Sequence, residues 1–168
     1  MILYLVRHAE AVPVGGMIHR DADRPLSPRG EDDAVLMGKA VANLCRDVGL
    51  ILTSPLVRAV RTGEIFRNNY TPPVVARTSD NLAPGFRYKA LLEELSGQRT
   101  IPAIIAIGHQ PDLSAFIAYL VADGSPAAVA MASAAVAKLS IPDGDPAAGA
   151  QLLWLLTPEV VRTITPQP

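Results

Sequence analysis

The alternation of short apolar runs with amphipathic stretches limits the fold of this chain more than any other feature. Each apolar run is short and ends at a polar break, which is typical of a buried strand. The predicted strands are residues 2–6, 50–53, 73–78 and 102–108, and the predicted helices are residues 27–49, 54–69, 86–97 and 110–124. This order predicts an α/β fold, a three-layer sandwich whose mainly parallel sheet has helices on both faces.

Helix-start signals support these boundaries. Ser27 stands at an N-cap position and Pro28 at the first helical position, and Ser54 with Pro55 repeats the pattern. Gly49 is a plausible stop for the first helix. Residues 9–26 have no clear periodicity and predict a loop.

The last third of the chain changes character. Its two apolar segments are residues 131–141 and 151–156, joined by a Pro-Asp-Gly-Asp-Pro turn at 142–146. The alanines of the first segment favour a helix, but the turn and its apolar partner favour a β-hairpin. We therefore expect a C-terminal β-hairpin.

Chain length, apolar content and net charge limit the classes of protein to which this chain can belong. The 168 residues are 49% apolar with a net charge of −1, which predicts one folded domain over 1–168 and no nucleic-acid or membrane partner. Cys45 is the only cysteine, so a disulfide framework is excluded and a reducing cytoplasm is expected. The apolar start at 1–6 is too short for a signal peptide or a membrane span.

Polar side chains follow three of the predicted strands. Arg7 and His8 follow the first, Ser54 precedes a helix that carries Arg58, and His109 follows 102–108. Ligands of such sheets bind beyond the carboxyl ends of the strands. A lone histidine there is more often structural, and a lone helical arginine more often solvated. Their convergence, with two helix N-termini, instead predicts a pocket for a tetrahedral phosphoryl group.

Other uses of these residues fit less well. The sequence has no His-x-His or His-Glu-x-x-His pattern, Cys45 has no partner, and His19 would have to supply a third ligand from the loop, so a metal site is not expected. The chain also lacks the phosphate loop of nucleotide hydrolases, a Gly-x-Ser-x-Gly elbow and a cysteine-phosphatase loop.

Three motifs resemble the histidine phosphatase superfamily, also called phosphoglycerate mutase-like. They read "LVRHAEA", "SPLVRAVRT" and "GHQP", in the family's order between residue 3 and about residue 140. The short chain and the stretch "RPLSPRG" look most like the small SixA-type phosphohistidine phosphatases.

The resemblance implies roles for four residues. His8 becomes the nucleophile that takes the phosphoryl group, and Arg7, Arg58 and His109 bind its oxygens. Neutral imidazole is abundant at pH 7, because its reference pKa is about 6.5, so His8 needs no separate base. The arginines supply the charge neutralisation, and the resemblance implies no metal and no cofactor.

The chain departs from the family in its proton donor. Mutase-like members carry a glutamate after the third strand, but "SDNLAPGFR" places Pro84 there. Asp80 is the nearest carboxylate, and Asp23 or Glu10 are further options. Without such an acid, the site favours phosphohistidine, since imidazole leaves more easily than an alkoxide.

Two further arginines depart from or extend the pattern. Arg61 replaces a glutamine of many relatives, and we expect it to pair with Glu64 on the helix surface. Arg24 corresponds to an arginine of the small subgroup and is predicted at the substrate rim. The alternative is an exposed pairing with Asp21 or Asp23.

These observations predict a cytoplasmic, metal-independent phosphatase that acts on protein phosphohistidine through phospho-His8. One alternative is the same chemistry on a small phosphorylated metabolite. Another is a phosphate-binding module without catalysis. A mutase is disfavoured, because mutases generally have longer chains.

Overall fold

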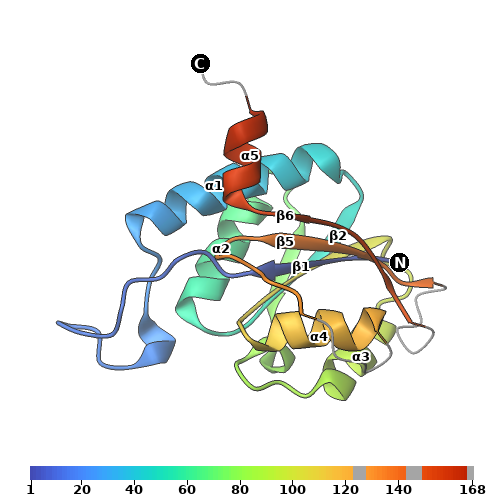
Figure 1. Cartoon of the computed structure of the whole chain (residues 1–168), viewed down its shortest axis with the longest axis horizontal. Coiled ribbons are helices and arrows are strands. Elements are labelled where there is room, and N and C mark those ends of the chain that lie inside the picture. Colours follow the sequence, from blue (N-terminus) through green and yellow to red (C-terminus); the bar gives the residue numbers. More distant parts are fainter. Residues whose placement is uncertain (123–127, 143–148, 166–168) are drawn as a thin grey trace.

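The computed structural model describes residues 1–122, 128–142 and 149–165, which form a six-stranded sheet with helices on both faces (Figure 1). The strands are β1 (Ile2–Arg7), β2 (Val48–Thr53), β3 (Val75–Thr78), β4 (Ala103–Gly108), β5 (Val136–Ser140) and β6 (Gln151–Leu156). The α-helices are α1 (Pro28–Leu44), α2 (Val57–Arg67), α3 (Tyr88–Ser96), α4 (Asp112–Val121) and α5 (Pro158–Ile164), and two short 3-10 turns are η1 (Asp21–Asp23) and η2 (Asp80–Leu82). The predicted α/β sandwich is confirmed.

The sheet has the strand order β3-β2-β4-β1-β5-β6. The first four of these strands run parallel, whereas β5 and β6 add an antiparallel hairpin at one edge. The predicted hairpin is therefore confirmed in its two strands, and its turn lies outside the described residues from position 143 on. Because β1 and β4 are central neighbours, their carboxyl ends lie side by side.

Both faces of the central strands β1 and β4 are buried, which explains why these strands are mainly apolar. On β1, Leu3 and Leu5 point to one face, and Tyr4 and Val6 point to the other. The face with Tyr4 and Val6 packs against α1, α2 and α5, and the opposite face packs against α3 and α4. These two apolar cores fix the central strands and hence the position of the residues that follow them.

Two predicted helix boundaries are wrong. The first helix ends at Leu44, where Cys45 is already extended, and Gly49 lies inside β2 rather than after the helix. Ser54 does not cap the second helix, because α2 begins only at Val57 with Leu56 at the N-cap. The Ser27–Pro28 start is as predicted, and the Ser27 hydroxyl accepts a hydrogen bond from the Gly30 amide.

The C-terminal helix α5 was not predicted, although its sequence repeats the same start signal. Thr157 caps the helix, Pro158 follows at the first position, and Arg162 forms an ion pair with the buried Asp33 of α1. The predicted end of the fourth helix at Gly124 lies outside the described residues.

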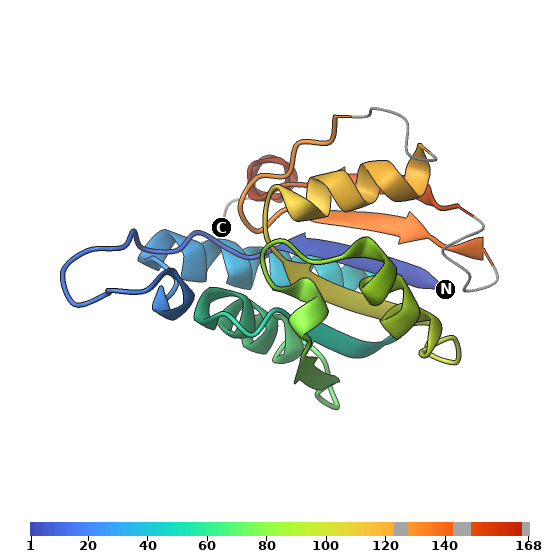
Figure 2. The ribbon, with the colours of Figure 1, turned by 90° about the horizontal axis from the view of Figure 1, so that it is seen from below.

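Residues 12–20 form a projecting loop at one end of the molecule (Figures 1 and 2). Its tip is closed by a bridge between Gly15 and Ile18, and Met17 is 95% exposed there. The loop returns through η1 to the N-terminus of α1, so Asp21 and Arg24 come back to the body of the protein. None of the helices in the described part of the chain is long and apolar enough to cross a membrane.

Candidate active site

The register of the central strands brings two distant histidines together. Arg7 pairs with Gly108 across β1 and β4, so His8 and His109 each follow directly at the same edge. The His8 amide donates to the Gly108 carbonyl over 3.0 Å, and the two imidazole rings are 4.9 Å apart between centroids. Apolar packing of the two strands thus places both imidazoles in one crevice.

Arg58 reaches this crevice from the second position of α2. Its side chain points back towards the helix N-terminus, as long helical side chains do, and the residue is 4% exposed. The Nε atom donates to His8 Nε2 over 3.1 Å, and one terminal nitrogen lies 3.4 Å from His109 Nδ1. Arg58 is therefore a buried cation in contact with both histidines.

Arg7 supplies a second guanidinium from the end of β1. One terminal nitrogen donates to the Met131 carbonyl over 2.8 Å, which fixes its orientation. Its Nε is buried and has no hydrogen-bond partner among the residues that the structure describes. A buried donor without an acceptor is costly, and an anion in the crevice is a suitable acceptor.

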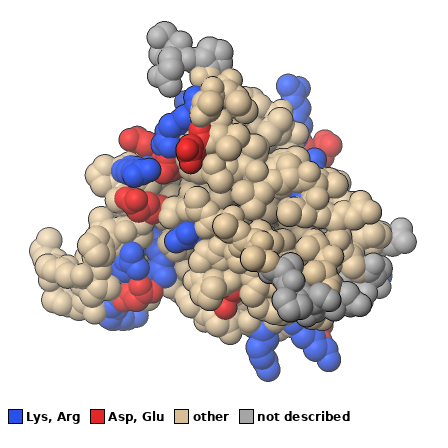
Figure 3. Space-filling model, in the orientation of Figure 1, with Lys and Arg blue, Asp and Glu red and all other residues tan. Residues whose placement is uncertain are grey.

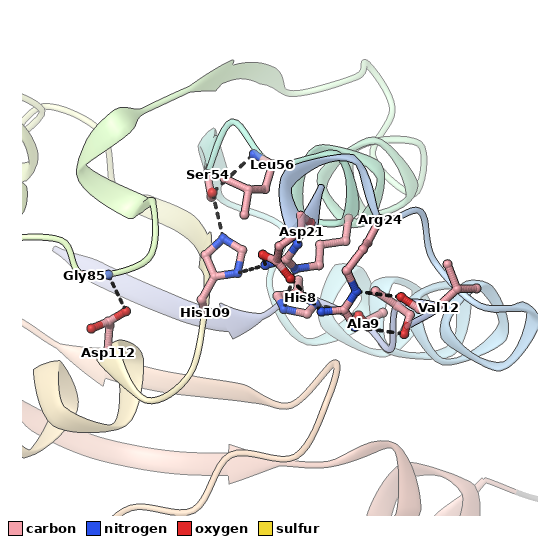
Figure 4. A network of polar contacts seen from close by, with 12 residues as sticks. His8, Ala9, Val12, Asp21, Arg24, Ser54, Leu56, Gly85, His109 and Asp112 are labelled. Carbon is pink, nitrogen blue, oxygen red and sulfur yellow. Dashed lines mark hydrogen bonds and ion pairs between the residues drawn. The ribbon is translucent and has the colours of Figure 1, made fainter. Parts of the chain in front are cut away.

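These side chains line a pocket of about 430 Å³ at the carboxyl edge of the sheet. Figure 4 shows His8, Asp21, Arg24 and His109 close together there. The residues that line this pocket are Arg7, His8, Glu10, Ala11, Asp21, Arg24, Arg58, Pro84, His109, Gln110 and Ser133. The structure thus places all five of the predicted site residues around one cavity. Acidic and basic side chains are mixed over the face of the molecule drawn in Figure 3.

Both histidines are neutral at pH 7. The pKa of His8 is lowered to about 4, mainly by burial. The nearby Arg58 and Arg7 also lower this pKa, whereas the hydrogen bond to Ala9 raises it. Burial also lowers the pKa of His109 to about 3, with His8 and Arg58 acting in the same direction. His8 Nδ1 donates to the Ala9 carbonyl over 2.7 Å, so its Nε2 lone pair faces Arg58 and the pocket.

Ser54 belongs to the site through a contact that its sequence position does not indicate. Its hydroxyl lies 2.7 Å from His109 Nε2, and both residues are almost fully buried. Because Arg58 donates towards Nδ1, Nε2 carries the proton in this state and donates to Ser54. The residue was interpreted as a helix cap, and only its place at a strand end pointed to the site.

Asp21 is a second site residue that was not predicted from the sequence. Its carboxylate oxygens accept from Arg58 and Arg24, each over 2.9 Å, and its backbone carbonyl accepts from Arg58 over 2.7 Å. These arginines lower the pKa of Asp21, so the group is ionised at pH 7. No sequence signal marked it, because an aspartate in an irregular loop has no periodicity to place it.

Arg24 lines the pocket and is paired with Asp21, and a contact between Arg24 and substrate stays a prediction. Its Nε donates to the Val12 carbonyl over 2.6 Å, and a terminal nitrogen lies 3.3 Å from the Ala11 carbonyl. Asp23 pairs instead with Arg20, away from the pocket.

The other carboxylates that were considered as a proton donor occupy different places. Pro84 lines the pocket, whereas Asp80 is exposed in η2 and does not line it. Glu10 lines the pocket and accepts from the Ser27 hydroxyl over 2.7 Å. Arg61 pairs with Glu64, as predicted, and also with Glu31 of α1.

Metal-ligating side chains are scattered. Among residues 1–122, 128–142 and 149–165, no three His, Cys, Asp or Glu side chains are grouped closely enough to hold a metal ion. The donors of the pocket are instead guanidinium and imidazole groups, which suit an oxyanion.

Comparison with known sequences identifies the class. The model of the histidine phosphatase superfamily (branch 1) matches residues 3–83, the segment that carries Arg7, His8 and Arg58. An uncharacterized protein of Picosynechococcus sp. is 35% identical over 115 residues, which cover 67% of this chain and 68% of that protein. The chain belongs to the histidine phosphatase superfamily and is an enzyme of the phosphatase class.

Solved structures share the fold over nearly the whole chain. The protein histidine phosphatase SixA complexed with tungstate has a TM-score of 0.84 at 21% identity, covering 96% of this chain and 99% of that one. The putative phosphohistidine phosphatase SixA from Nakamurella multipartitia has a TM-score of 0.77 at 26% identity, covering 94% and 95%. Within the superfamily, the fold of this chain is therefore like that of the SixA-type proteins, as the short length predicted.

Proposed function

We propose that the protein is a metal-independent phosphatase that forms a phosphohistidine at His8 and that its favoured substrate is protein phosphohistidine. One observation carries this proposal. The His8 ring is neutral and is held through Nδ1 on the Ala9 carbonyl, so its Nε2 lone pair faces Arg58 and a pocket that Arg7 also lines. A nucleophile beside a group of oxyanion donors is the arrangement that phosphoryl transfer requires.

In the first step the Nε2 lone pair of His8 attacks phosphorus while the bond to the leaving group breaks and its electron pair departs with that group. Arg58 releases His8 Nε2 and donates to the phosphoryl oxygens, together with Arg7 and His109. Each charge-assisted hydrogen bond contributes about 1.5–3 kcal/mol. These bonds accelerate the step to the extent that they strengthen as phosphorus becomes trigonal bipyramidal.

The tautomer of His109 matters for this step. When a phosphoryl oxygen replaces Arg58 as its neighbour, Nδ1 must carry the proton in order to donate. The Ser54 hydroxyl then donates to Nε2 instead of accepting from it, since a hydroxyl serves in both directions. Ser54 is therefore proposed as a positioning residue that lets neutral His109 donate to the phosphoryl group.

In the second step water attacks the phosphorus of phospho-His8 from the side that the leaving group has vacated. The bond to Nε2 breaks, its electron pair returns to the ring, and inorganic phosphate leaves. Arg7 and Arg58 stabilise the same equatorial oxygens in both steps. The arginines supply the positive charge throughout, so no metal ion is needed.

The substrate preference rests on the leaving group. Pro84 lines the pocket where the mutase-like pattern has a glutamate, and Asp21 is held ionised by two arginines. Imidazole departs with less protonation than an alkoxide, so the site favours phosphohistidine over a phosphate ester. The similarity of the fold to a protein histidine phosphatase and to a putative phosphohistidine phosphatase, both of the SixA type, supports this choice.

A small phosphomonoester is the second candidate, and Glu10 is the observation that favours it. This carboxylate lines the pocket and is held by a hydroxyl rather than by an arginine. In the ester reaction it would protonate the departing alkoxide.

A substrate panel in excess EDTA tests the proposal. We expect turnover of a phosphohistidine peptide and of phosphoramidate to exceed that of p-nitrophenyl phosphate in kcat/KM, with no loss on chelation. A clear preference for the ester contradicts the proposal that protein phosphohistidine is the favoured substrate. Loss of activity in EDTA contradicts metal independence. Lack of turnover of both the phosphohistidine peptide and phosphoramidate contradicts the proposed substrate class.

The compartment and the domain organisation belong to the same proposal. We propose the cytoplasm because Cys45, the only cysteine, is buried and free. We also propose that residues 1–168 form one domain, since the hairpin β5–β6 extends the same sheet as β1.

A further inference from the structure

Asp21 occupies the donors that a phosphoryl group would need. Its carboxylate and its backbone carbonyl both accept from the terminal nitrogens of Arg58, over 2.9 and 2.7 Å. Figure 4 shows Asp21 between His109 and Arg24, next to His8. One N–H group cannot serve the carboxylate and a phosphoryl oxygen equally well, so a phosphoryl group that binds this terminal nitrogen displaces the carboxylate from it.

The displaced carboxylate stays close to the pocket. Its other oxygen accepts from Arg24 over 2.9 Å, and Arg24 is itself anchored on the Val12 carbonyl over 2.6 Å. The Arg58 side chain is 5% exposed and that of Asp21 is 56% exposed, so the aspartate has room on the solvent side. Arg24 therefore keeps an ionised carboxylate on the solvent side of the pocket.

We propose that Asp21 is the residue that selects the leaving group, because its displaced carboxylate accepts a hydrogen bond from the distal ring N–H of a phosphohistidine substrate. This inference rests on the proposed function and names a residue for its substrate preference. A leaving group without an N–H or O–H donor gains nothing from a carboxylate at the rim. A ring that carries a proton on its distal nitrogen is stabilised by it.

The chemistry balances without a proton donor at the departing nitrogen. The substrate ring is protonated at its distal nitrogen, and the hydrogen bond to Asp21 favours that form. His8 Nε2 forms the new bond to phosphorus, and the electron pair of the old bond stays on the departing nitrogen. The ring leaves as neutral imidazole with its distal proton in place. A site that uses Asp21 in this way needs no glutamate at the position of Pro84.

The test compares Asp21→Asn with the wild type on two kinds of substrate. We expect kcat/KM for a phosphohistidine peptide to fall about ten- to a hundredfold relative to that for p-nitrophenyl phosphate, because an amide stabilises the protonated ring poorly. Inorganic phosphate should inhibit the variant more tightly, since a neutral side chain competes less for Arg58. Asp23→Asn is the matched control, because Asp23 lies in the same turn and pairs with Arg20 outside the pocket.

The outcomes of this experiment distinguish failure of the inference about Asp21 from failure of the proposed function. An equal loss for both kinds of substrate, or phosphate inhibition unchanged by Asp21→Asn, overturns this inference while the proposed function stands. A wild type that hydrolyses neither the phosphohistidine peptide nor phosphoramidate removes the proposed function, and the inference falls with it. A ratio that also changes in Asp23→Asn assigns the effect to the turn and not to Asp21.

Discussion

The pH dependence of the free energy of unfolding tests the lowered pKa values of the two buried histidines. Burial lowers the pKa values of His8 and His109 to about 4 and about 3, whereas unfolded histidine titrates near 6.5. Between these values the unfolded chain binds protons that the folded protein excludes. The stability of the fold is therefore complete above pH 6.5 and decreases as the pH falls towards 4.

The magnitude follows from the separation of these pKa values. Between pH 6.5 and pH 5, each histidine lowers the free energy of unfolding by about 1.5 kcal/mol, and the two together by about 3 kcal/mol. The lowered pKa values of carboxylates such as Asp21 act at lower pH, outside this interval. We expect His109→Asn to lose about half of the dependence, because asparagine has no proton to gain.

Urea unfolding of the wild type and of this variant at several pH values between 5 and 7 measures the effect. His19→Asn is the matched control, since His19 is exposed in the projecting loop. The same measurement on His8→Asn gives an independent value for the second ring. The reasoning is refuted if both pocket variants keep the full dependence of the wild type.

Substitutions at three further positions test the site and its support. Arg58→Lys should lower kcat/KM about a hundredfold or more on any phosphorylated substrate in steady-state assays, because a lysine cannot reproduce the planar guanidinium contacts. Ser54→Ala should lower kcat/KM about tenfold, and Ser54→Thr should restore much of it, since only the hydroxyl orients His109; an unchanged Ser54→Ala removes the positioning role. Gly30→Ala should lower the free energy of unfolding by about 1–3 kcal/mol in urea, because its Cβ would overlap the Glu10 carbonyl; a wild-type midpoint contradicts this packing.

The framework of the site was predictable because it depends on strong local signals. Apolar periodicity located β1 and β4, and the rule for parallel sheets placed the residues after them at one edge. Arg58 was expected near the pocket, and the structure has it among the lining residues. It lies closer to the start of its helix than expected, because α2 begins at Val57 and not at the predicted Ser54 cap.

The missed features depend on contacts that no local pattern encodes. Asp21 reaches Arg58 only because the projecting loop folds back onto α2, and such a return has no periodic signature. Ser54 has the sequence of a helix cap, but its hydroxyl bonds to His109, which is 55 positions away along the chain. The helix start at Thr157–Pro158 was a local signal that went unused.

Trapping the covalent intermediate tests the central proposal most directly. The enzyme is mixed with phosphoramidate, quenched in alkali, in which phosphohistidine survives, and digested for mass spectrometry. We predict one phosphoryl group on the peptide that carries His8 in the wild type, lost on acid treatment and absent in His8→Ala. A phosphoryl group on another residue, or turnover by His8→Ala at the rate of the wild type, would contradict the assignment of His8 as the nucleophile.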